Sequence, residues 1–162
     1  MLDQLEWLGK KEELEFRKIK FTGKDAGKSW QYAQSIDGLI ITRAIVFAMA
    51  ALVFYPILSN YLFHDVFTMD LLVERVIFSL MLIVGGVLFN RNRVIAIIIA
   101  SIPIGLILLT YLFFQDQMHI YKIGFTAAVL FLVLRGLHYN KRSKKLKQEL
   151  DSVLLENQLI DD

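Results

Sequence analysis

One apolar run of the chain, residues 94–114, most constrains what this protein can fold into. It reads VIAIIIASIPIGLILLTYLFF, which is 21 residues without a charged side chain. Because a helix rises about 1.5 Å per residue, the run would span roughly 30 Å, the thickness of the hydrocarbon core of a bilayer. A core helix of a soluble protein would carry a polar stripe facing water, and this run has none. We therefore predict a membrane-spanning helix here.

Three further apolar runs resemble the first in length and composition. They raise the hydrophobic content of the 162-residue chain to 56%, above the roughly 45 to 50% of ordinary globular domains. The sequence predicts an all-α integral membrane protein, in which four transmembrane helices form one bundle over residues 39–138. The predicted spans are residues 39–63, 71–89, 94–114 and 120–138.

The two polar ends are expected to form helices outside the bilayer. Residues 1–38 are predicted to be an amphipathic or interfacial segment, although the spacing of Leu14 and Phe16 fits a strand nearly as well. Residues 139–162 begin with a basic cluster and then turn acidic, with apolar residues at helical spacing. We expect this tail to form an amphipathic helix whose acidic part, including Glu149, faces basic residues of the N-terminal segment.

The distribution of basic residues predicts the orientation of the spans. Of the 18 lysine and arginine residues, sixteen fall on one side of the membrane, and only Arg75 and Lys122 fall on the other. Lysine and arginine are enriched in cytoplasmic connections. Both termini are therefore expected to be cytoplasmic, in a multi-pass protein of a bacterial inner membrane.

Basic residues near the ends of the spans are expected to contact anionic lipid headgroups or a partner. Arg43 lies four residues inside the first run, where a long guanidinium side chain can reach back to the interface. The full set is Arg43, Arg91, Arg93, Arg135, Lys141, Arg142, Lys144, Lys145 and Lys147. No nucleic-acid partner is expected: the net charge of +2 hides a strong asymmetry, and the position of the basic residues matters more than their sum.

Small residues and prolines inside the runs predict where the helices approach one another and bend. Glycine, alanine and serine let helix backbones come close in lipid, where the hydrophobic effect does not drive association. The predicted packing positions are Ala44, Ala48, Ala51, Gly85, Gly86, Ala100, Ser101, Gly105, Gly124 and Ala128. Each of the two prolines, Pro56 and Pro103, removes a backbone donor and is expected to kink its helix.

Few residues of the sequence indicate a catalytic, nucleotide-binding or metal-binding site. The absence of cysteine excludes disulfides, thiolate metal sites and cysteine nucleophiles. Residues 22–29 differ from the phosphate-loop pattern at its first glycine, and the soluble part before the first span is too short for the sheet that carries such a loop. No metal site or cofactor is predicted; the weak candidates for a metal are His64, Asp65, Asp70, Glu74, Asp116 and His119, at the outer rim.

These features favour a non-catalytic membrane component. We expect an accessory subunit or a self-associating scaffold, either a homo-oligomer or part of a larger membrane complex. The alternative is a small oligomeric pore or transporter, for which the two prolines would supply bends. A third hypothesis is a membrane enzyme that uses the histidine and carboxylate side chains of the outer rim.

Overall fold

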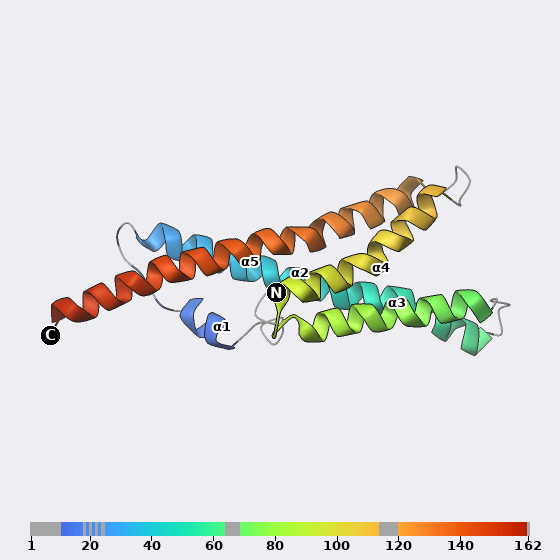
Figure 1. Ribbon diagram of the computed structural model, residues 1–162, viewed down its shortest axis with the longest axis horizontal. Helices are drawn as coiled ribbons and strands as arrows, with labels where there is room; N and C mark the ends of the chain where they lie inside the picture. Colours follow the sequence, from blue (N-terminus) through green and yellow to red (C-terminus); the bar gives the residue numbers. More distant parts are fainter. Residues whose placement is uncertain are drawn as a thin grey trace. The chain divides into compact units, whose positions relative to one another are not determined.

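The computed structural model describes residues 11–17, 19, 21, 23, 25–63, 69–113 and 120–161, and this described part is helical, without strands. Its elements are five helices, which Figure 1 labels. They are α1 (Lys11–Arg17), α2 (Asp25–Phe63), α3 (Met69–Leu88), α4 (Arg93–Phe113) and α5 (Ile120–Asp161).

Three of these helices are long and apolar enough to cross a membrane. The qualifying segments within the described residues are Asp25–Tyr55 of α2, Arg93–Phe113, and Ile120–Leu155 of α5. They confirm the prediction of an all-helical membrane protein. The prediction for residues 94–114 matches α4 closely, and α4 stays helical through the buried Pro103.

The helices extend further than the apolar runs predict. Helix α2 already begins at Asp25, and α5 continues from the fourth run through the tail to Asp161 without interruption. Before α2, Gly23 has a φ of 63°, a conformation that glycine adopts without steric cost. The N-terminal segment is helical over Lys11–Arg17, which decides against a strand at Leu14 and Phe16.

Two compact units divide the chain, and the first combines Met1–Ile41 with Gly136–Asp162. Apolar side chains of α2 (Tyr32, Ile36, Leu39 and Ile40) and of α5 (Leu146 and Leu150) are buried in its core. Against this core lies α1, whose Phe16 ring meets the Tyr32 ring edge-on at 5.2 Å. A Cβ on Gly38 would lie 2.6 Å from the Tyr139 ring, so the absence of a side chain there lets α2 approach α5.

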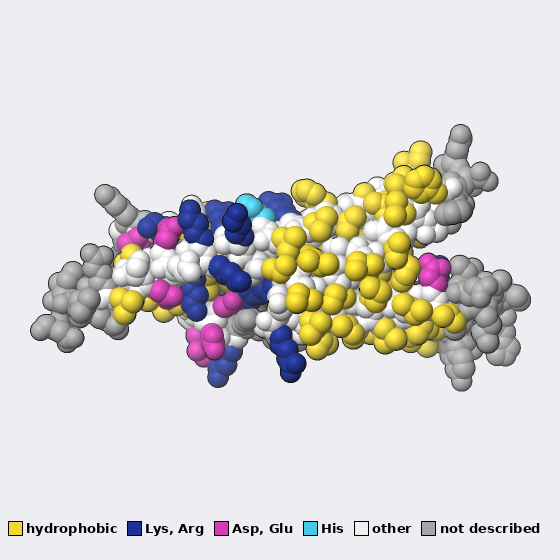
Figure 2. Space-filling view, viewed as in Figure 1, with side chains coloured by type: hydrophobic (Ala, Val, Ile, Leu, Met, Phe, Trp, Pro, Cys, Tyr) yellow, Lys and Arg dark blue, Asp and Glu magenta, His cyan; other side chains and the backbone are white. Residues whose placement is uncertain are grey.

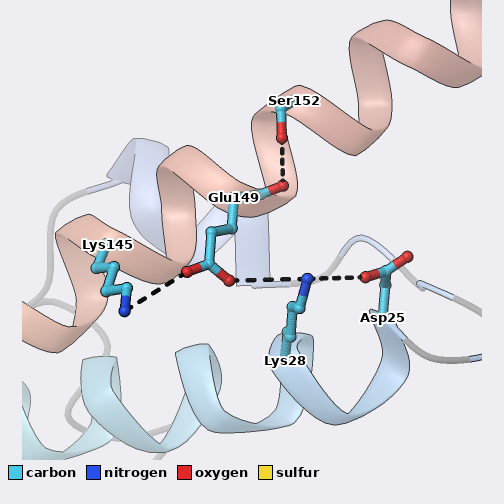
Figure 3. Close-up of polar contacts among 5 residues, drawn as sticks. All are labelled: Asp25, Lys28, Lys145, Glu149 and Ser152. Atoms are coloured by element: carbon cyan, nitrogen blue, oxygen red, sulfur yellow. Dashed lines mark hydrogen bonds and ion pairs between the residues drawn. The ribbon is translucent and has the colours of Figure 1, made fainter.

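An ion-pair cluster joins α2 and α5 in this first unit (Figure 3). Nζ of Lys28 lies 3.3 Å from a carboxylate oxygen of Asp25 and 3.7 Å from one of Glu149, which Lys145 also approaches at 3.9 Å. The expected contact between the acidic part of the tail and a basic residue of the N-terminal segment is therefore confirmed for this pair. Lys28 is the lysine of the phosphate-loop-like stretch, and here it holds two carboxylates.

The second unit, Thr42–Arg135, contains α3, α4 and the adjoining parts of α2 and α5. Helices α3 and α4 pack along each other as an antiparallel pair. A Cβ on Gly85 would lie 3.1 Å from the backbone oxygen of Ala96 and 3.2 Å from Cβ of Ala100. Gly85 therefore permits the close contact of the two backbones, as small residues do between membrane helices. On its visible face, hydrophobic side chains cover this unit (Figure 2).

Replacing Gly85 with leucine should separate α3 from α4 and destabilise the protein. Inserting a side chain into a packed contact typically costs 1–3 kcal/mol, so we expect a clear loss of thermal stability in detergent. The matched control is Gly105→Leu in α4, because no atom lies within 4 Å of a Cβ built on Gly105. Equal melting temperatures for the two variants would contradict this account of the contact.

Candidate functional site

Arg43 of α2 forms a buried polar contact with the end of α3. Its side chain is only 7% exposed. Nε donates a hydrogen bond to the carbonyl oxygen of Gly86 at 2.9 Å, and Nη1 donates one to Oδ1 of Asn90 at 3.0 Å. The guanidinium carbon also lies 5.6 Å from the centre of the Phe47 ring, within range of a cation–π contact.

The position of Arg43 follows from the chemistry of a helix end. Carbonyl groups in the last turn of a helix lack a hydrogen-bond partner within the helix, and α3 ends at Leu88. A cation beside these carbonyls is also favoured by the helix dipole. Gly86 contributes by having no side chain, since a Cβ there would lie 2.6 Å from Phe47 ring atoms. Instead of the expected headgroup contact, the guanidinium of Arg43 therefore binds the end of α3.

A cavity of about 660 Å³ lies among α2, α3, α4 and α5 of the second unit. Helix α2 contributes only apolar side chains to it, whereas each of the other three helices contributes both apolar and polar ones. The lining residues are Met49, Leu52 and Val53 of α2; Glu74, Arg75 and Phe78 of α3; Ile107, Thr110 and Tyr111 of α4; and Tyr121, Lys122, Phe125 and Thr126 of α5.

Polar side chains gather at one end of this cavity. Glu74 and Arg75 lie in the second turn of α3, and Lys122 is the third residue of α5. Nζ of Lys122 lies 5.9 Å from the ring centre of Tyr111 and 6.0 Å from that of Tyr121. The cavity thus combines an apolar wall with two cations and one carboxylate near the ends of the helices.

The outer-rim candidates for a metal are mostly outside the described residues, as for His64, Asp65, Asp116 and His119. Asp70 belongs to α3, and of the six only Glu74 has a described side chain, which lines the cavity. Within the described ranges, no group of three or more histidine and carboxylate side chains is placed to hold a metal ion.

The predicted packing positions differ in exposure. Gly85, Gly86 and Ala100 are buried in contacts between helices of the second unit. Ser101 donates its hydroxyl to the carbonyl oxygen of Ile97 in the same helix at 2.7 Å. Ala44 and Gly105 are half-buried, whereas the remaining positions are exposed: Ala48, Ala51, Gly124 and Ala128.

The basic residues also divide by exposure. Arg93, the first residue of α4, is buried, and Arg142 and Lys147 are half-buried; Lys147 lies over the Phe16 ring at 5.5 Å. The others have the exposure that a headgroup or partner contact would need: Arg91, Arg135, Lys141, Lys144 and Lys145.

Asn90 and the cavity were not predicted from the sequence. Asn90 becomes significant only through Arg43, which is 47 positions away in the chain. For the cavity a signal was available, since Arg75 and Lys122 are the two basic residues on the predicted outer side. The structure shows that α3 and α5 line one cavity. Arg75 and Lys122 can then be read together as parts of one polar site.

Removing the guanidinium of Arg43 should destabilise the second unit. In Arg43→Met, the oxygens of Gly86 and Asn90 lose a charged donor, and hydrogen bonds to charged groups contribute about 1.5–3 kcal/mol each. We expect a lower melting temperature in detergent, with Arg43→Lys intermediate because an ammonium lacks the planar fork of donors. The control is Arg91→Met, whose side chain is exposed; if Arg43→Met melted at the same temperature as this control, the capping role would be refuted.

Comparisons of the chain with protein-family models, with curated proteins and with solved structures gave no match. A functional proposal for this membrane protein therefore depends on its own residues. The features that can support one are the cavity, the contact of Arg43 and the exposed small residues.

Proposed function

We propose that the chain is a four-span protein of a bacterial inner membrane with both termini in the cytoplasm. In this proposal it acts without catalysis, as a self-associating scaffold or as an accessory subunit of a membrane complex. The observation that carries the proposal is the exposed face of α5, where Gly124 and Ala128 have no covering helix in the described part of the chain.

Helix α3 is the fourth span in this proposal. Its 20 residues would cover roughly 30 Å of bilayer, and it packs along α4, which is long and apolar enough to cross a membrane. Between Val73 and Leu88 its charged side chains are Glu74 and Arg75, both near its start. Apart from Glu74 near its start, the exposed large side chains of this stretch are aliphatic, as lipid contact requires: Val73, Ile77, Leu80, Ile83, Val84 and Val87.

The proposed orientation rests on the basic residues around the short connection between α3 and α4. Arg91 and Arg93 lie in or beside this connection, on the side that collects sixteen of the 18 basic residues if four helices cross the membrane. A bias of this size is the usual signature of the cytoplasmic side.

Self-association is favoured by the geometry of α5. Gly124 and Ala128 are four residues apart and lie on the helix face opposite Thr126, Val129 and Val133, which are buried in the second unit. No atom lies within 4 Å of a Cβ built on Gly124. Two small residues at this spacing let a second membrane helix approach closely, and a second copy would present the same face.

Cysteine labelling tests the four-span topology. The chain has no cysteine of its own, so in a single-cysteine variant the reagent can label only the introduced thiol. In intact cells an impermeant thiol reagent should label Asp116→Cys, in the connection between α4 and α5, and should leave Lys144→Cys unlabelled until the membrane is opened. The reverse pattern would overturn the orientation, and labelling of both in intact cells would overturn the assignment of opposite sides.

Oxidative cross-linking tests self-association. A disulfide needs Cα atoms about 4.4–6.8 Å apart, so Ala128→Cys should give a covalent dimer in native membranes only if α5 approaches its copy. The matched control is Ile77→Cys, exposed on α3 and at the same distance in sequence from the start of its helix. We expect at least severalfold more dimer from Ala128→Cys, and further substitution of Gly124 with leucine should suppress it. Equal yields for Ala128→Cys and Ile77→Cys would contradict the α5 interface.

The cavity supports a second candidate function, a small oligomeric pore or transporter. Polar side chains at one end of a cavity within a helical bundle are a common feature of solute sites. Purified protein in sealed vesicles distinguishes the two functions. Solute or ion flux that depends on Lys122 would favour transport, whereas vesicles that stay tight under all imposed gradients would remove this candidate.

A further inference from the structure

The cavity of the second unit has the size of a ligand site. Pockets that hold small molecules and cofactors usually enclose about 300–1,000 Å³, and this cavity, at about 660 Å³, lies in the middle of that range. Its walls come from four helices of one compact unit. It therefore does not require a second copy of the chain or the proposed contact at Gly124.

One part of the cavity wall suits a hydrocarbon chain. Met49, Leu52 and Val53 line it from α2, and the apolar side chains of Phe78, Ile107 and Phe125 line it from the other three helices. An apolar cavity is a poor site for water, which needs several polar partners. A bilayer supplies acyl chains at high concentration to any apolar opening at this depth.

The other part of the wall suits an anionic headgroup. Among the described residues that line the cavity, Arg75 and Lys122 carry a positive charge and Glu74 carries a negative one, so this described lining has one positive charge in excess. Among the described residues, the recorded partners of Lys122 are the rings of Tyr111 and Tyr121, and tyrosine is enriched where spans meet the headgroups. Guanidinium and ammonium groups bind phosphate oxygens through charge-assisted hydrogen bonds.

We propose that this cavity binds one acyl chain of an anionic phospholipid, with the lipid phosphate beside Arg75 and Lys122. The charged end of the site lies near the ends of α3, α4 and α5, where the headgroup of a lipid in the same leaflet would be. The apolar end extends toward the middle of the helices, where the chain of that lipid would be. This binding site is additional to the proposed self-association, because its walls come from one unit of a single chain.

Native mass spectrometry of the full chain, released from detergent with added lipid, tests the proposal. The probes are dioleoyl phosphatidylglycerol, dioleoyl phosphatidylcholine with the same chains, and dihexanoyl phosphatidylglycerol with the same headgroup. We expect the long-chain anionic lipid to bind at least tenfold more tightly than either of the other two. Equal affinity for the two dioleoyl lipids would overturn the role of charge, and equal affinity for the two phosphatidylglycerols would overturn the role of the cavity.

Variants then locate the site. A basic residue near an anionic lipid contributes about 1 kcal/mol, so Lys122→Gln and Arg75→Gln should each weaken dioleoyl phosphatidylglycerol binding about fivefold. The matched control is Lys11→Gln, an exposed residue of α1 outside the second unit, which should leave the affinity unchanged, and Lys144→Gln tests the alternative site on the tail. Loss of binding in Lys144→Gln with none in Lys122→Gln would place the lipid on the tail and refute the proposal. Elution of each variant as a single symmetric peak verifies that it is folded, and if one basic variant fails this check the other still decides.

Discussion

The second unit depends on how the buried guanidinium of Arg43 and the end of α3 satisfy each other. A buried carbonyl without a partner costs several kcal/mol, and Arg43 supplies donors from a neighbouring helix to the carbonyl of Gly86 and to the side chain of the exposed Asn90. The same contact neutralises part of the cost of burying a guanidinium, because both oxygens carry partial negative charge. Each partner therefore lowers the free-energy cost of burying the other, and the contact holds α2 against α3. Since both helices line the cavity, the contact also fixes two of the cavity's four walls.

The sequence was sufficient to predict an all-helical membrane protein, because uncharged runs of membrane length report directly on the surroundings of the chain. Helix ends were harder to predict. Hydropathy identifies residues that can enter hydrocarbon, whereas a helix continues wherever packing supports it, so α2 begins at Asp25 and α5 extends to Asp161. The site was predictable only in part. Arg43 was recognisable as unusual, but its partners are 43 and 47 positions away, and no local pattern connects them.

The small residues also show what the sequence alone does not predict, namely which of them pack against a helix of the same chain. Gly85 and Gly124 look alike in sequence, since each lies in an apolar run within four residues of another small residue. In the structure Gly85 meets the backbone of α4, whereas Gly124 has open space. The difference arises from which helix face is already covered within the chain, and this is a property of the whole bundle. A small residue that no neighbour covers is the position at which a further helix can be accommodated without overpacking.

The two proposed interactions adjoin each other on α5. Lys122 lines the cavity from the helix face opposite Gly124. Tyr121 and Phe125 also line the cavity, but they share the exposed face of Gly124 and Ala128. A lipid held between α3, α4 and α5 would restrict the position of α5 and would lie beside the face offered to a second copy. If this restriction favours the arrangement that a second copy recognises, lipid binding and self-association strengthen each other by the same factor, because coupling between two binding equilibria is reciprocal. If α5 holds the same position with and without lipid, the coupling factor is one and the two interactions are independent. The lipid dependence of the Ala128→Cys cross-link thus measures whether the cavity and the interface act together.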